Sequence, residues 1–527
     1  MPAFSPPRAA RLWLGGLYVC GAASLLVACG GGGGGGGADA SQRPGAQSWV
    51  AGVFRPAESQ TNFCAAPRTG IDPYTTQAFA DKAGSTLDEN HWLRSWTHDN
   101  YLWYDEVVDR NPALYTTPEY FALLKTPALT PAGLPKDRFH FSYPTEQWNA
   151  MSLTGESAGY GMHLAMLQAQ PPRELAVVYT EPGSPAAAPG VDIARGARVL
   201  SVNAIDLVNE NKPESIAALN SALSPTVAGV STQFTILDAG ASVPRTITLQ
   251  SAQVVSQPVQ NARTFTGPNG RTVGYLQFND HIRTAEQQLA QAMEKLRQEG
   301  ATELIVDLRY NSGGFLYVAS QLAYMIAGRN NSQGRIFERS VFNDKVEASG
   351  KAVAPMSFLA TGSGNAIPTG VPLPSLDLRR VYVLAGANTC SASESLINGL
   401  QGIDIDVVKI GATTCGKPYG FYPQANCGST YFSVQFRTVN AKGFGDYAEG
   451  IAPTCSVPDD LTHPLGDVRE ARMAAALNHM ATGACTVAAS SASARRSVAP
   501  IAAPQTTPET VLLNKPEGLR NRILEMS

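Results

Sequence analysis

The sequence has little charge and none of the residue patterns that hold metals. Only 16% of its 527 residues are charged, the formal net charge is −3, and no arginine-rich run follows the first dozen residues. A nucleic-acid-binding surface needs concentrated positive charge, so we expect no nucleic-acid partner. No C-x-x-C pair occurs and the seven histidines show no ligand spacing, which argues against a zinc site. We therefore expect neither a metal nor a cofactor.

A long apolar run is also missing from the body of the chain. After residue 29, no apolar stretch approaches the roughly 20 residues that a membrane-spanning helix needs. The length leaves room for two or three domains, and the 44% hydrophobic content is typical of a globular protein. We expect a folded body that does not span a membrane.

The first 29 residues are typical of an export signal. A short basic region precedes an apolar stretch over residues 12–28, and Leu26-Val27-Ala28 stands directly before Cys29. This ending resembles the lipobox of bacterial lipoproteins, whose cysteine is lipidated. An ordinary signal peptide with an incidental cysteine is the alternative. With the glycine-rich, flexible tether at residues 30–55, the pattern predicts a body on the periplasmic side of the envelope, anchored through Cys29 to the outer membrane.

Six cysteines remain once this leader is set aside. An even number in an exported chain predicts disulfides, whose pairing the sequence alone does not fix. Five of them follow residue 385, so at least part of the framework braces the C-terminal region. The six are Cys64, Cys390, Cys415, Cys427, Cys455 and Cys485.

The composition and the hydrophobic pattern change several times along the rest of the chain. Residues 56–148 predict a small, mostly helical domain, in which a helix over 88–106 carries Trp92, Trp96 and Trp103 into a core. Strands alternate with helices over residues 257–487, which is typical of an α/β core. An Ala/Ser/Pro-rich composition over residues 488–527 predicts a disordered tail.

Residues 149–256 are rich in short apolar runs separated by Gly and Pro, and they resemble a PDZ domain. The resemblance rests on Gly183-Ser184-Pro185-Ala186-Ala187 and on the strand at 198–203. In PDZ domains a loop of backbone N–H groups captures a peptide's terminal carboxylate, and the peptide adds as a strand. Another small β-rich domain is the alternative. The resemblance implies that residues 163–167 receive the peptide and that the capturing loop is Gly159, Tyr160, Gly161 and Met162.

Ser391 lies where a nucleophile would be placed in the α/β core. A buried strand at 381–385 precedes it and a helix follows from about residue 393, so the hydroxyl would sit at a helix N-terminus. There the N–H of Ala392 could stabilise developing negative charge. Gly313 or Gly314, in a glycine turn after the strand at 303–308, could supply a second donor.

A serine hydroxyl needs a base, and Lys417 is the candidate. Only His463 and His479 follow Ser391, and neither lies in a recognisable turn. Lys417 comes just after the apolar strand at 407–410, which returns it to the same sheet edge. A lysine serves as a base only when neutral, a state that burial in an apolar site favours.

Three ordered blocks, at residues 307–314, 390–394 and 414–417, resemble the signature of the C-terminal-processing, or tail-specific, peptidases. The resemblance implies a crotonase/ClpP-like α/β core and a serine endopeptidase that acts on polypeptides with free C-termini. Carried over, Ser391 is the nucleophile and Lys417 the base. Many members place an orienting glutamine four residues after the lysine; here Phe421 stands there, and Gln424 is a possible substitute.

Three other interpretations stay open. Residues 155–159 match the G-x-S-x-G pattern, which would make Ser157 the nucleophile of an esterase if a strand preceded it and a helix followed. Cys390 is a second possible nucleophile. The missing glutamine also allows a non-catalytic, peptide-binding lipoprotein.

Overall fold

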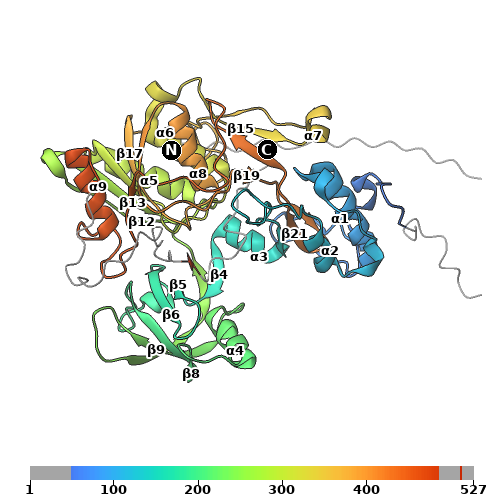
Figure 1. Ribbon diagram of the computed structural model, residues 1–527, viewed down its shortest axis with the longest axis horizontal. Helices are drawn as coiled ribbons and strands as arrows, with labels where there is room; N and C mark the ends of the chain where they lie inside the picture. Colours follow the sequence, from blue (N-terminus) through green and yellow to red (C-terminus); the bar gives the residue numbers. More distant parts are fainter. Residues whose placement is uncertain (1–48, 486–510, 513–527) are drawn as a thin grey trace, which may run out of the picture. The chain divides into compact units, whose positions relative to one another are not determined.

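A computed structural model describes residues 49–485 and 511–512 (Figure 1). The predicted signal peptide, the lipidation at Cys29 and most of the glycine tether lie outside the described residues. So does the predicted disordered tail, except at one point: Val511–Leu512 form the short strand β24, so the prediction is wrong there. Within the described ranges, no helix combines the length and apolar character needed to cross a bilayer.

A mostly parallel sheet organises the largest core. Its order is β12-β13-β14-β17-β18-β23, with only β12 antiparallel to its neighbour. The inner strands are apolar on both faces because both faces are covered, as parallel sheets require. The bounds are Val259–Thr266 (β12), Thr272–Phe278 (β13), Glu303–Asp307 (β14), Arg380–Ala385 (β17), Asp406–Gly411 (β18) and Cys455–Ser456 (β23).

Helices cover the two faces of this sheet unequally. Three helices, α5 (Ala285–Gln298), α6 (Leu316–Ser332) and α8 (Ala392–Gly402), share one apolar cluster with Val381 and Val383 of β17. The alternate residues Tyr382 and Leu384 pack on the opposite face with α9 (Ala471–Thr482). The predicted α/β alternation is confirmed.

The N-terminal region is helical but is not independent of the α/β core. Helix α1 (Thr86–Asn100) ends before Trp103, so the helix predicted over 88–106 is too long. Trp92 packs against Tyr431 at 5.5 Å between ring centroids, and the Cys64–Cys427 disulfide joins the same two regions. The remaining elements here are β1 (Phe63–Cys64), β2 (Lys82–Ala83), α2 (Thr117–Leu123), β3 (Phe141–Pro144) and α3 (Thr145–Asn149).

Residues 156–255 form a β-rich unit with its own apolar cluster. One sheet has the order β10-β9-β7-β6-β5-β24, and α4 (Pro213–Leu223) packs against it. Strand β24 runs antiparallel to β5, with Leu512 opposite Ala165. The bounds are β4 (Glu156–Gly159), β5 (Met162–Gln168), β6 (Glu174–Thr180), β7 (Arg198–Val202), β8 (Ile205–Asp206), β9 (Ser231–Leu237), β10 (Arg245–Gln250) and β11 (Ala252–Val255).

Two-stranded sheets form from β1 with β2 and from β4 with β11, and two larger, but still small, sheets lie beside the core. One has the order β16-β15-β22-β19, and the other, β20-β21-β3, joins the N-terminal region to the core. Their bounds, with that of one short helix, are β15 (Ile336–Phe342), α7 (Asp344–Ala348), β16 (Met356–Ser357), β19 (Tyr419–Gly420), β20 (Gln424–Asn426), β21 (Ser429–Phe432) and β22 (Phe436–Val439).

Candidate active site

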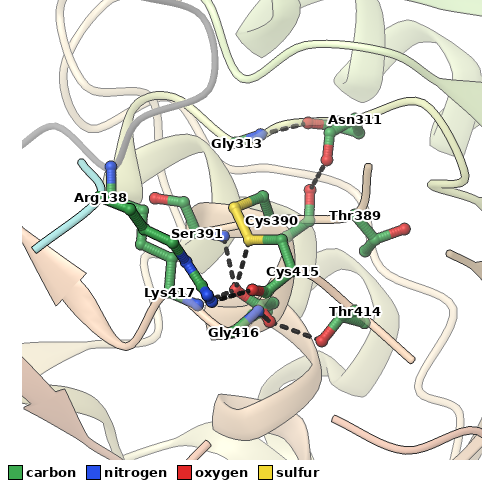
Figure 2. Close-up of a disulfide and its surroundings, with 12 residues drawn as sticks. Arg138, Asn311, Gly313, Thr389, Cys390, Ser391, Thr414, Cys415, Gly416 and Lys417 are labelled. Atoms are coloured by element: carbon green, nitrogen blue, oxygen red, sulfur yellow. Dashed lines mark hydrogen bonds between the residues drawn. A yellow bond between two sulfur atoms is a disulfide. The ribbon is translucent and has the colours of Figure 1, made fainter. Parts of the chain in front are cut away.

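Three loops meet at the carboxyl edge of the central sheet, which is where ligands bind in open α/β sheets. They follow β14, β17 and β18, and each carries one of the blocks noted in the sequence. The strands end at the same level, because Asp307 lies opposite Leu384 and Ala385 lies opposite Gly411. Ser391 and Lys417 therefore both belong to this edge (Figure 2).

Ser391 has the backbone geometry of a residue held at a sharp turn. It is the N-cap of α8, with φ 58° and ψ −115°, and its side chain is fully buried. A non-glycine residue at positive φ is strained, and such strain concentrates at functional sites. Ala392 follows as the first helical residue, so its N–H has no partner within the helix.

Glu394 joins the nucleophile loop to the lysine loop. Its carboxylate accepts hydrogen bonds of 2.8 Å from the backbone N–H groups of Ser391, Gly416 and Lys417, and one of 2.5 Å from the Thr414 hydroxyl. Burial raises the pKa of Glu394, although these hydrogen bonds oppose the shift. Sequence reasoning missed this role, since an acidic residue in the first turn of a helix is ordinary capping.

Lys417 is fully buried among aromatic rings. Its Nζ lies 4.2 Å from the ring centre of Phe421 and 5.0 Å from that of Phe139. Gly416 precedes it at φ 80°, and a Cβ there would lie 2.3 Å from the Ala448 carbonyl oxygen. The loop therefore requires glycine at this position.

The glycine turn after β14 lies directly beside Ser391. A Cβ at Gly313 would fall 2.7 Å from Ser391 Cβ, so only glycine fits. The Gly313 N–H donates to Asn311 Oδ1 at 2.9 Å. The backbone bridge between His281 and this turn uses Gly313 O and Phe315 N, and does not engage the Gly314 N–H.

Asn311 is a second organising residue that the sequence interpretation did not single out. Its carbonyl accepts from the Cys390 N–H and from the Ser393 hydroxyl, both at 3.1 Å. Its side chain contacts His281 Nδ1 at 2.9 Å and donates to the Phe278 carbonyl at 3.0 Å. Through its carbonyl and its side chain, this one buried residue thus connects the nucleophile loop with the segment that contains Phe278 and His281.

A buried arginine cluster lies next to the site. Arg309 pairs with Asp307 (2.9 Å), Asp459 (2.8 Å) and Glu470 (2.8 Å). Arg195, from the β-rich unit, reaches the same Asp459 at 2.8 Å. Burial alone would raise the pKa of Asp459, but the neighbouring arginines outweigh it and hold the pKa well below its usual range.

The loop predicted to capture a peptide's carboxylate lines a cavity of about 330 Å³. Tyr160 is buried and its hydroxyl donates to Thr232 Oγ1 at 2.7 Å, while Met162 belongs to the apolar cluster of the unit. A Cβ at Gly161 would lie 2.1 Å from Ser184 Cβ. Gly159 lines the same cavity.

The six cysteines form three disulfides, Cys64–Cys427, Cys390–Cys415 and Cys455–Cys485, which confirms the expectation from export. The second bond occupies Cys390, which therefore offers no free thiolate for attack. Ser157 lies in strand β4, paired to β11, with a π-helix before it. The strand–turn–helix setting that an esterase nucleophile requires is absent at this serine.

The possible substitute for the missing glutamine lies elsewhere. The Gln424 amide donates to the Ala425 carbonyl at 3.4 Å. The Phe421 ring, four residues after Lys417, faces the lysine together with the Phe139 ring. Ring packing and the Glu394 bonds to its loop contribute to the orientation of Lys417.

Comparison with known proteins places this site in a family. Residues 272–456 match the sequence profile of peptidase family S41. The chain carries a peptidase family S41 domain. This S41 domain contains β13 to β23 and all three loops at the sheet edge, and it places the chain among the proteases.

Two similar proteins are described as carboxyl-terminal-processing proteases. The one from Picosynechococcus is 24% identical over 347 residues, covering 65% of this chain and 71% of its own length. The one from Synechocystis is 27% identical over 273 residues, covering 51% and 54%. A crystal structure from Bacteroides fragilis, assigned to the S41 proteases, matches with a TM-score of 0.57 at 26% identity and covers 74% of this chain and 96% of its own. The predicted family resemblance is confirmed.

Proposed function

We propose that the chain is a serine endopeptidase of the C-terminal-processing type, in which Ser391 attacks the peptide carbonyl and Lys417 takes its proton. The observation that carries the proposal is the Glu394 carboxylate, which accepts the backbone N–H of both residues at 2.8 Å. A nucleophile and base need a fixed mutual geometry before they contribute to rate. This shared acceptor supplies such a frame.

The surroundings of Lys417 favour the neutral amine that a base must be. Removal from water costs an ammonium several kcal/mol. Burial next to the Phe421 and Phe139 rings disfavours the charged ammonium, and this is the physical basis on which we assign Lys417 the role of base.

Two backbone donors are positioned to stabilise the tetrahedral intermediate. The Ala392 N–H is at the start of α8, where the helix dipole favours negative charge. Of the two candidate glycines, Gly313 already donates to Asn311, so we assign the second donor to Gly314. Gly313 has a steric role, because a side chain at this position would collide with Ser391.

We further propose that the β-rich unit is a PDZ domain that receives a substrate's C-terminus along β5. The pairing of β24 with β5 supports this, because it places a segment of chain on that edge in the antiparallel direction that carries a terminus toward residues 159–162. An exported location, with the chain held at the envelope through Cys29, agrees with three disulfides in the described residues.

The test is cleavage of an unstructured protein with an apolar C-terminus by a form that lacks residues 1–48. Wild type should cut, while Ser391→Ala and Lys417→Ala should each lose at least about a thousandfold in kcat/KM, as removal of a nucleophile or base does. Ser320→Ala and Lys409→Ala, outside the site, serve as matched controls. Equal inactivity of wild type and all variants would favour a peptide-binding lipoprotein instead.

A further inference from the structure

One of the three disulfides lies inside the site. Cys390 directly precedes Ser391, and Cys415 stands two residues before Lys417, so the Cys390–Cys415 bond joins the two loops that carry the proposed dyad (Figure 2). The other two bonds brace the N-terminal region and the segment after α9.

The nucleophile loop and the lysine loop are held by different kinds of structure. Cys390 is at the start of α8, and its N–H donates to the Asn311 carbonyl at 3.1 Å. Residues 412–418 form no helix or strand between β18 and β19. They contact the nucleophile side through hydrogen bonds: the Ala412 N–H donates to the Ala385 carbonyl at 3.0 Å, the Cys415 N–H donates to the Thr389 carbonyl at 3.1 Å, and Glu394 accepts the bonds described above. From another side, Arg138 donates to the Cys415 carbonyl at 2.8 Å. The disulfide is the covalent link among these contacts.

Glu394 holds the two loops together through hydrogen bonds alone. Its carboxylate is fully buried, and the Cys415 sulfur lies 3.5 Å from its Oε2 atom. Hydrogen bonds to one carboxylate exchange and rearrange, whereas a disulfide fixes the Cα atoms of its two residues, here at 5.2 Å. The bond therefore limits how far the lysine loop can shift from Ser391 when its hydrogen bonds rearrange.

We propose that the Cys390–Cys415 disulfide is a positioning element that holds the Lys417 loop against Ser391, so that the peptidase works only when this bond is oxidised. The inference rests on the proposed roles of Ser391 and Lys417. Cys415 is partly exposed whereas Cys390 is buried, so a small thiol reaches the bond from the Cys415 side. Dithiothreitol would supply two electrons and two protons, leaving two cysteine thiols and its own cyclic disulfide.

The decisive variant is Cys390→Ala/Cys415→Ala, compared with Cys64→Ala/Cys427→Ala and Cys455→Ala/Cys485→Ala. Each pair removes one disulfide. The first should lower kcat about 100-fold, the loss expected when reacting groups move by about 1 Å, with KM nearly unchanged. The two control pairs should lower the melting temperature but keep kcat within about threefold. Comparable kcat losses in all three pairs, or none in the first, would overturn the proposal.

Reduction of the wild-type protein provides a second, reversible test. Dithiothreitol should inhibit wild type and the control pairs, should not further inhibit the Cys390/Cys415 variant, and should be reversed by reoxidation. Because the two sulfurs and the Glu394 carboxylate lie within 4.8 Å of one another, the assay needs a chelator to prevent zinc capture by the freed thiols. If dithiothreitol leaves wild-type activity unchanged although mass spectrometry shows that the bond is reduced, the proposal is contradicted.

A readout independent of catalysis separates this proposal from the proposed function. Hydrogen exchange of residues 412–418 should speed up on reduction in wild type and be fast from the start in the Cys390/Cys415 variant. This holds even if wild type fails to cleave, an outcome that would refute the peptidase assignment alone. Unchanged exchange in this loop on reduction would refute the positioning role alone.

Discussion

Glu286 and Glu394 are two buried glutamates with similar structural roles in different helices, α5 and α8, of the S41 domain. Each lies in the first turn of a helix and gathers donors from a distant loop. Glu286 accepts from Gln321 Nε2 (2.6 Å) and from the N–H groups of Ser363, Ala366 and Ile367 (2.7, 2.8 and 3.0 Å). Only Glu394 organises a loop that carries a proposed catalytic group.

The pKa values of these two similarly placed carboxylates are shifted in opposite directions. Burial would raise the pKa of Glu286, but hydrogen bonds from Gln321 and the loop outweigh it and lower the pKa. At Glu394 burial prevails and the pKa is raised. A buried carboxylate can thus fix a loop whether or not its charge is fully compensated. The number of hydrogen-bond donors alone therefore does not decide whether the pKa of a buried carboxylate is raised or lowered.

The largest effect should come from Glu394→Gln. A carboxamide offers one acceptor oxygen and turns an NH₂ group toward N–H donors, so bonds worth about 1.5–3 kcal/mol each are lost. We expect kcat/KM to fall by at least about 100-fold, since the backbones of Ser391 and Lys417 lose their shared acceptor and the two side chains shift relative to each other, even with the Cys390–Cys415 bond intact. Glu286→Gln is the matched control: similar destabilisation in a denaturant titration, with nearly unchanged kcat per folded molecule. Equal kcat losses in both variants would remove the distinction between the two sites.

A smaller effect is expected from Thr414→Val, which keeps the shape of the side chain. The variant loses the Thr414 hydroxyl bond to Glu394 and the bond from the Ile451 N–H. Each neutral or charge-assisted bond of this kind is worth about 1–2 kcal/mol, so kcat should fall about tenfold. Steady-state kinetics at fixed pH measures this. A loss as large as that of Glu394→Gln would mean that the hydroxyl, and not the carboxylate, organises the loop.

The smallest effect concerns the pH dependence of stability. A lowered pKa at Glu286 means stabilisation that is present above the unfolded value, about 4.3, and lost as pH falls through the folded pKa. A raised pKa at Glu394 has the opposite sign: its stabilising effect is present below about 4.3 and lost as pH rises through the folded pKa. In urea titrations from pH 3.5 to 7, Glu286→Gln should flatten the rise of stability with pH and Glu394→Gln should steepen it. Shifts of the same sign would refute this assignment.

Much of the fold and the location of the candidate site could be predicted because the information is local. Buried runs such as Leu304-Ile305-Val306 and the glycine turn after them indicate a parallel strand and the sheet edge where the candidate residues lie. Ser391 and Lys417 follow from their places after two such strands. The aromatic spacing around Trp92 also predicts a buried helix, although the end of that helix was placed too late because Trp103 packs by tertiary contact.

What the sequence did not reveal depends on contacts between distant residues. The pairing of Cys64 with Cys427 spans 363 residues, and no local pattern selects it. The role of Glu394 is hidden because its partners lie about twenty residues away in a loop. Likewise, the commitment of the Gly313 N–H to Asn311 depends on a turn geometry that the glycine pattern alone does not specify.

The account depends most on Ser391 being the reactive hydroxyl and Lys417 the group that activates it. Labelling with a fluorophosphonate, followed by intact mass and peptide mapping, measures this directly and without a protein substrate. We predict one adduct, on Ser391, absent in Ser391→Ala and formed at least about 100-fold more slowly in Lys417→Ala. An adduct on another residue that persists in Ser391→Ala, or an undiminished rate in Lys417→Ala, would contradict the account.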